Sequence, residues 1–97
     1  MDWRKTAEYR RWRVAVIRRD GVCQICNRRK NRQAHHINSA SYFPDERFNV
    51  DNGITLCRSC HSQFHNNYKK STRQKCTKDD WDNFCVLVEY VKNLGGE

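Results

Sequence analysis

The sequence has few of the features that would place it outside the ordinary globular class. It holds 4 glycines and 1 proline, and no internal repeat or low-complexity tract is present, which excludes repeat architectures. No apolar run approaches the ~20 residues that a membrane-crossing helix needs. The N-terminal stretch lacks the apolar segment of a secretory signal. We therefore expect no membrane partner and an intracellular location, where thiols stay reduced.

Acidic residues are in the minority. The chain has 19 Lys and Arg against 11 Asp and Glu, which gives a formal net charge of +8. Such a charge on a short chain favours a polyanionic partner, with nucleic acid the first candidate. The basic residues concentrate at 4–19 and in a basic linker at 69–75, where we expect them to contact phosphates rather than read bases. A basic surface that serves only solubility is the alternative.

The chain of 97 residues, of which 37% are hydrophobic, is long enough for one domain with a modest core. A core of this size usually needs a disulfide or metal staple. Apolar residues at helical spacing, and short strand-like segments at 34–37 and 54–56, predict an α+β fold. The predicted organisation is a single domain over 1–97. An N-terminal basic helix at 2–19 ends at Asp20-Gly21, and a core at 20–70 contains a helix from Cys57 onward. A C-terminal helix at 78–94 opens at Thr77 and buries Trp81, Phe84, Val88 and Val91.

The chain has six cysteines, which can supply such a cross-link. Four of them form two CxxC pairs, and each pair can place two thiolates on one tetrahedral zinc ion. A closed site of four thiolates leaves no position for water or substrate, so its role is structural. Two disulfides are the alternative, but a bridge within CxxC is typical of redox catalysts with a βαβ pattern, which is missing. Cys76 and Cys85 are expected to be buried or incidental thiols. The predicted structural zinc ligands are Cys23, Cys26, Cys57 and Cys60.

All four histidines lie within or beside the segment that the cysteine pairs enclose. His61 and His65 are one turn apart on a predicted helix, so their imidazoles can share one cation. His35 and His36 are adjacent on an extended segment, where neighbouring side chains point to opposite sides. One of these two can therefore bind a metal while the other approaches the reaction from a different direction.

Four segments of the chain, given at the end of this paragraph, resemble the HNH nuclease family, notably its small, phage-type, zinc-containing members. The resemblance covers about residues 19 to 65 and rests on the order of CxxC, HH, N, CxxCH and a later His. It implies a ββα-metal (His-Me finger) core, with two short strands and a helix around one divalent cation. The segments are Arg19-Asp-Gly-Val-Cys-Gln-Ile-Cys26, Ala34-His-His-Ile37, Asn52-Gly-Ile-Thr-Leu-Cys-Arg-Ser-Cys-His61 and Phe64-His65.

The resemblance also implies roles for individual residues. His36 resembles the general base that activates water, and Asn52 resembles the residue that orients this base or its loop. Asp51-Asn52-Gly53 is at the same time a good turn signal, and both interpretations can hold. The residues that resemble ligands of the catalytic metal, which would be Mg²⁺, Mn²⁺ or another divalent ion, are His35, His61 and His65.

The resulting expectation is a metal-dependent endonuclease of phage or homing type that hydrolyses phosphodiester bonds in double-stranded DNA, by nicking or by double-strand cleavage. One such site cuts one strand, and the chain is expected to be a monomer or weak dimer, in the host cytoplasm if it is phage-encoded. Two alternatives stay open. One is a zinc-bearing DNA-binding module that does no chemistry, and the other is an accessory that is active only with a phage packaging protein.

Overall fold

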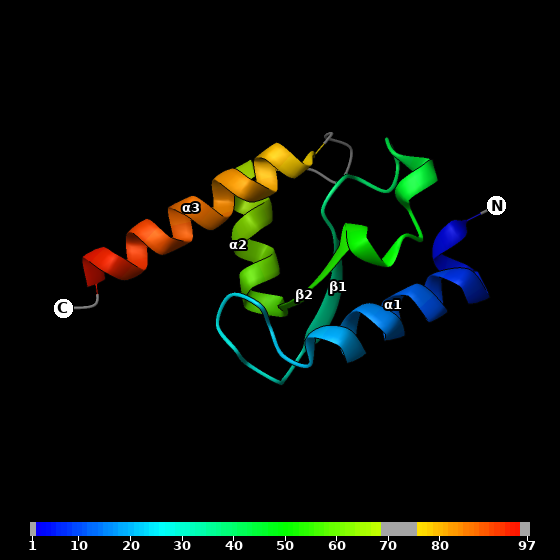
Figure 1. The fold of residues 1–97 in the computed structure, drawn as a ribbon, viewed down its shortest axis with the longest axis horizontal. Coiled ribbons are helices and arrows are strands. Elements are labelled where there is room, and N and C mark those ends of the chain that lie inside the picture. Colours follow the sequence, from blue (N-terminus) through cyan, green and yellow to red (C-terminus); the bar gives the residue numbers. More distant parts are fainter. Residues whose placement is uncertain (1, 69–75, 96–97) are drawn as a thin grey trace.

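The computed structural model describes residues 2–68 and 76–95 and confirms a small α+β fold (Figure 1). The expected linker at 69–75, with the last two residues of the expected core, lies outside the described residues. In chain order the elements are the 3₁₀ helix η1 (Trp3–Lys5), α1 (Ala7–Asp20), β1 (Arg32–His36), the 3₁₀ helices η2 (Pro44–Glu46) and η3 (Val50–Asn52), β2 (Gly53–Cys57), α2 (Arg58–Tyr68) and α3 (Lys78–Gly95).

The N-terminal helix differs from the one expected over 2–19, because it is divided at Thr6. This residue has an extended backbone (φ −88°, ψ 158°), and its hydroxyl accepts a hydrogen bond from the backbone N–H of Tyr9 at 3.2 Å. A threonine that caps a helix in this way starts a new helix after it. α1 therefore begins at Ala7 and ends, as expected, before Gly21, whose φ of 75° suits a glycine C-cap.

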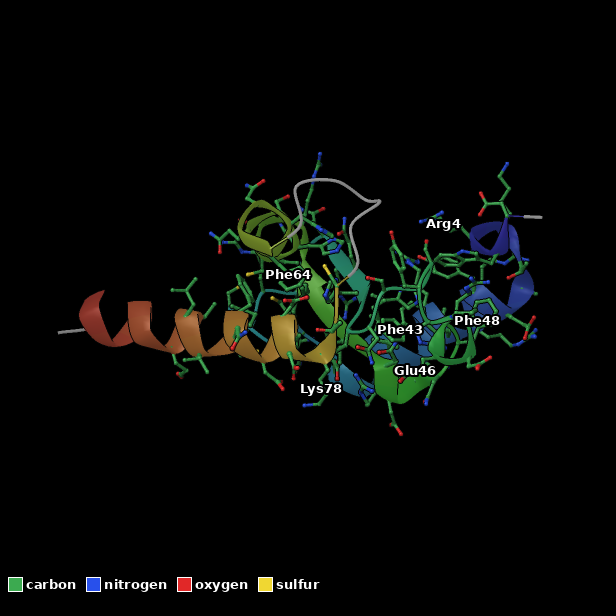
Figure 2. All side chains as sticks on the ribbon, turned by 90° about the horizontal axis from the view of Figure 1, so that it is seen from above. Arg4, Phe43, Glu46, Phe48, Phe64 and Lys78 are labelled. Carbon is green, nitrogen blue, oxygen red and sulfur yellow. The ribbon has the colours of Figure 1, made fainter. Side chains whose placement is uncertain are left out.

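The two strands form an antiparallel sheet with α1 on one face and α2 on the other (Figure 1). Trp12 and Val16 of α1 are buried against the sheet, at 2% and 0% exposure. Phe64 of α2 is fully buried between α2 and α3 (Figure 2), in ring contact with Trp81 and Phe84. The second half of α3 projects away from the sheet (Figure 1). The sheet therefore separates two apolar clusters.

The pairing of β1 with β2 fixes which side chains face which helix. His35 pairs with Ile54 and His36 pairs with Gly53. Successive residues of a strand face opposite sides, so His35 faces α2 while His36 faces α1. The segment between the strands, residues 37–52, is closed by the backbone N–H of Ile37, which donates to the carbonyl of Asn52 at 2.9 Å.

Candidate functional site

The four cysteines of the CxxC pairs come together beside the end of β2. Their sulfur atoms all lie within 4.8 Å of one another, and Cys26 Sγ lies 3.6 Å from Cys57 Sγ. Two sulfurs on one tetrahedral zinc ion at ~2.3 Å would lie roughly 3.8 Å apart. None of the cysteines is in a disulfide, Cys76 and Cys85 included. The geometry and the thiol donors fit a structural zinc ion held by Cys23, Cys26, Cys57 and Cys60.

The electrostatics of this cluster also favour a cation. Burial raises the pKa of Cys23, but the backbone N–H groups of Cys26, Cys57 and Ile25 outweigh it, and the pKa falls to about 7. Burial, together with the neighbouring thiols of Cys57 and Cys23, raises the pKa of Cys60. The thiolate of Cys23 therefore forms more easily than that of Cys60, because burial and the neighbouring thiols disfavour a second negative charge in the cluster. A divalent cation removes this repulsion.

Backbone hydrogen bonds hold the cysteine knuckle in place, and the side chain of Gln24 adds a bond to the carbonyl of Val22 at 2.9 Å. The N–H of Cys23 donates to the carbonyl of Arg28, and the N–H of Asn27 donates to the carbonyl of Cys23, each at 2.9 Å. Asn27 has a φ of 64°, in the left-handed region that asparagine tolerates better than most residues. The N–H of Gln24 donates to the carbonyl of Thr55, which ties the knuckle to β2.

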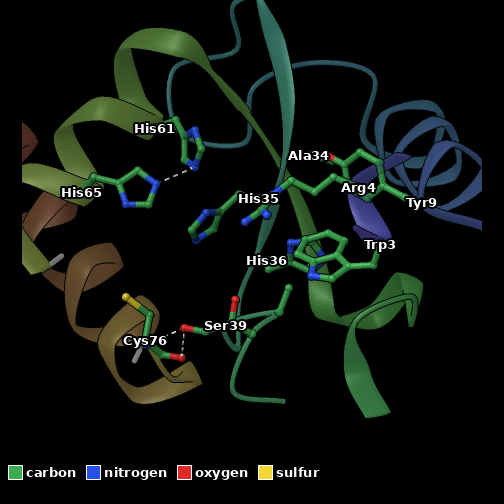
Figure 3. Close-up of a pocket in the computed structure, with 12 residues that line it drawn as sticks. Trp3, Arg4, Tyr9, Ala34, His35, His36, Ser39, His61, His65 and Cys76 are labelled. Atoms are coloured by element: carbon green, nitrogen blue, oxygen red, sulfur yellow. Dashed lines mark hydrogen bonds between the residues drawn. The ribbon is translucent and has the colours of Figure 1, made fainter. Parts of the chain in front are cut away.

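Three of the histidines form a second cluster on the α2 side of the sheet (Figure 3). His35 of β1 is buried, with 5% exposure, and its ring lies 5.0 Å from that of His61, centroid to centroid. His61 and His65 of α2 approach each other, with their Nε2 atoms 2.9 Å apart. One ligand nitrogen from each of the three residues lies within 4.8 Å of the other two. Two nitrogens bound to one ion lie roughly 3 Å apart, so this set fits a divalent cation.

His36 lies on the opposite side of β1, against α1. Its ring stacks on Trp12, with centroids 3.9 Å apart and planes at 7°, and the ring of Trp3 meets it edge-on at 5.5 Å. His36 Nε2 lies 2.9 Å from the backbone carbonyl of Arg47. Because a carbonyl only accepts hydrogen bonds, Nε2 carries the proton and Nδ1 of the neutral ring keeps its lone pair. The side chain is thus fixed in the tautomer that can accept a proton at Nδ1.

Asn52 is 4% exposed, and its side-chain amide forms hydrogen bonds with backbone groups of the segment between the strands. Its Oδ1 accepts from the backbone N–H of Asn38 at 2.8 Å. Its Nδ2 donates to the carbonyls of Asn38 and Glu46, at 3.0 and 3.2 Å. The amide does not touch His36. It holds the segment that presents the carbonyl of Arg47.

One cavity of about 210 Å³ brings the two groups of histidines together (Figure 3). His36 reaches it from the α1 side, and His35, His61 and His65 reach it from the α2 side. Arg4 also lines it, and its guanidinium lies 4.4 Å above the ring of Trp3. None of the lining residues is acidic within the part of the chain that the structure describes. A phosphate group in this cavity would meet cationic and neutral side chains.

Two residues of this site escape prediction from sequence patterns. Gln33 contacts His61, with Oε1 2.6 Å from Nδ1. Arg47 contributes through its backbone carbonyl. A glutamine has no diagnostic spacing, and every residue has a carbonyl, so neither leaves a signal in the sequence.

The two strands and α2 thus carry one cluster of thiols and one cluster of imidazoles, each of which could hold a metal ion, as in a small metal-binding domain. Residues 23–67 match the family model described as HNH endonuclease. This part of the chain is therefore similar to an HNH endonuclease domain, and the likeness supports nuclease activity at the level of the family. No curated protein and no solved structure matched the chain. Within the described residues, no helix has the length and apolar character needed to cross a membrane.

Proposed function

We propose that this protein is a metal-dependent DNA endonuclease that hydrolyses phosphodiester bonds in the cavity between α1 and α2. The observation that carries the proposal is the arrangement of the four histidines. His36 is held by the carbonyl of Arg47 on one side of the cavity, and the other three form a cluster that fits a cation on the other side. The likeness to an HNH endonuclease domain and the net charge of +8 support a nucleic-acid substrate.

His36 acts as the general base in this proposal. Its Nδ1 takes a proton from the water that attacks phosphorus, and its Nε2–H stays donated to the carbonyl of Arg47, which stabilises the imidazolium ion that results. Trp12 keeps the ring from rotating away, and Asn52 supports the segment that carries Arg47.

The remaining histidines bind the catalytic cation. His35, His61 and His65 would hold one divalent ion, Mg²⁺, Mn²⁺ or another. Such an ion supplies stabilisation of the negative charge on the phosphate and on the departing oxygen. The four cysteines would hold zinc for structure alone.

One such site cuts one strand in a single encounter, so the first product expected from supercoiled DNA is the nicked circle. Double-strand cleavage then requires two copies or two encounters. No matched relative supports the phage or homing type or a packaging partner. Those remain predictions from the resemblance alone.

The test compares the unchanged protein with His36→Ala on supercoiled plasmid in Mg²⁺, Mn²⁺ or EDTA. Loss of a general base is expected to slow cleavage by about 10²- to 10⁴-fold. Because the variant also loses its contact with Trp12, added imidazole serves as a rescue and is expected to restore part of the rate. Ser62→Ala, an exposed change beside His61, is the control and should cleave like the unchanged protein.

Two results would contradict the proposal. Equal cleavage by His36→Ala would remove His36 from the chemistry. Binding of DNA without cleavage in every metal, by protein with full zinc content, would instead support the DNA-binding module without chemistry.

A further inference from the structure

Gln33 lies two residues before His35 on β1, so both side chains are on the face of the strand that meets α2. Its backbone pairs with Leu56 of β2, one pair in from the end of the sheet. The side chain is half-buried and reaches across to the first histidine of α2. A regular strand thus holds both a candidate metal ligand and a polar group beside the cluster.

The contact with His61 occupies the ring nitrogen that faces away from the other imidazoles. His61 Nδ1 lies 2.6 Å from Gln33 Oε1, whereas His61 Nε2 lies 2.9 Å from His65 Nε2. A carbonyl oxygen accepts only, so it requires the proton of the neutral ring to be on Nδ1. The lone pair is then on Nε2, the atom that points into the cluster.

We propose that Gln33 is a positioning residue for the metal centre, which selects the Nδ1–H tautomer of His61 and aims its Nε2 lone pair at the cation. The inference rests on the proposed function, because it assumes that the three imidazoles bind a metal. Metal-binding histidines generally donate their second N–H to an oxygen acceptor that fixes the ring. Gln33 supplies this acceptor without adding charge.

The location of Gln33 makes the contact rigid. The acceptor, Oε1 of Gln33, is on a strand that is paired with β2. Side chains on strands or helices keep their positions more precisely than side chains on loops. Without it, a turn of the His61 ring about χ2 would move Nε2 away from the metal, and the other tautomer would direct a proton toward the metal. The loss should therefore appear in metal affinity.

The experiment measures binding of Ni²⁺ by calorimetry, with protein that already contains one zinc ion per chain. Gln33→Leu keeps the size of the side chain and removes the acceptor. We expect about 10- to 100-fold weaker binding of Ni²⁺, as for other residues that orient metal-binding histidines. Gln33→Glu restores an acceptor and should bind Ni²⁺ about as tightly as the unchanged protein, or more tightly. Gln63→Leu, the same change at an exposed position of α2, is the control and should bind like the unchanged protein.

A second measurement separates positioning from general stability. Long-range ¹H–¹⁵N NMR correlations report which ring nitrogen of His61 is protonated. Nδ1–H is expected in the unchanged protein and in Gln33→Glu, and loss of this preference is expected in Gln33→Leu.

The outcomes distinguish the inference from the proposed function. If the unchanged protein binds Ni²⁺ and Gln33→Leu binds it equally well, or if His61 carries its proton on Nε2, the inference fails while the proposed metal site stands. If the unchanged protein binds no second metal ion, the metal site fails and the inference fails with it.

Discussion

A single buried amide, that of Asn52, organises the segment that holds the candidate base. Its one acceptor and its two N–H groups each meet a partner, and all three partners are backbone groups of Asn38 and Glu46. Arg47 follows Glu46 directly, and its carbonyl is the group that fixes His36. The position of the base therefore depends on a residue that it does not touch.

The change Asn52→Asp tests this dependence with almost no change in size. A carboxylate keeps the bond from the N–H of Asn38 but places negative charge against two carbonyl oxygens. Leaving these groups without donors is expected to cost about 1–3 kcal/mol or more, measured as the free energy of unfolding in urea. Cleavage should fall in addition, because the carbonyl of Arg47 moves with the segment. Asn83→Asp, the same change at an exposed site on α3, should alter neither quantity by much, and a similar loss there would argue against the specific role of Asn52.

At the scale of elements, the approach of α1 to the sheet depends on the absence of a side chain at Gly53. This residue opens β2 and pairs with His36. A Cβ atom here would lie 2.5 Å from Val16 Cγ2 and 2.7 Å from Trp12 Cζ2. Its φ of −121° is ordinary extended backbone, so glycine is needed here for space and not for conformation. The same space lets Trp12 stack on His36.

Gly53→Ala is therefore expected to push α1 away from the sheet. Overpacking of this kind costs about 1–3 kcal/mol. For a domain of this size, each kcal/mol lowers Tm by about 4–8 °C, which calorimetry can measure. Ser62→Thr, which adds one methyl group at an exposed site of α2, is the control and should change Tm little. Equal shifts in the two variants would show that packing against Trp12 is not the cause.

The strands and the helix whose residues follow a local pattern could be predicted from the sequence. The expected strands at 34–37 and 54–56 and the helix from Cys57 correspond to β1, β2 and α2 within two residues, because cysteine and histidine spacing marks their ends. The break at Thr6 went unpredicted, since the apolar spacing continues through it. The stacking of Trp12 on His36 joins positions that are distant in the chain, and such contacts depend on tertiary packing.

At the scale of the whole molecule, the four-cysteine cluster and the apolar core are one structure. Cys23, Cys57 and Cys60 are themselves members of the buried cluster that also contains Leu56, Phe64, Trp81 and Phe84. The cluster joins the knuckle, β2, α2 and α3. Small cores of this kind rarely supply more than about 3–5 kcal/mol without a staple. The fold should therefore depend on zinc as a whole and not only near the knuckle.

Cys26 allows this dependence to be separated from packing, because it is the exposed member of the four. Cys26→Ser removes one thiolate ligand and almost no buried apolar surface. Structural zinc contributes about 10–16 kcal/mol of apparent binding energy in small domains, so loss of even ~2 kcal/mol should lower Tm by about 10 °C, together with the zinc content. A strong chelator added to the unchanged protein should produce the same unfolding, seen as loss of helical circular dichroism. Cys85→Ser changes a half-buried thiol that is not one of the four clustered cysteines, and this variant should keep full zinc content. If Cys26→Ser melts like Cys85→Ser, the four thiols hold no metal that matters for folding, and the core alone carries the stability.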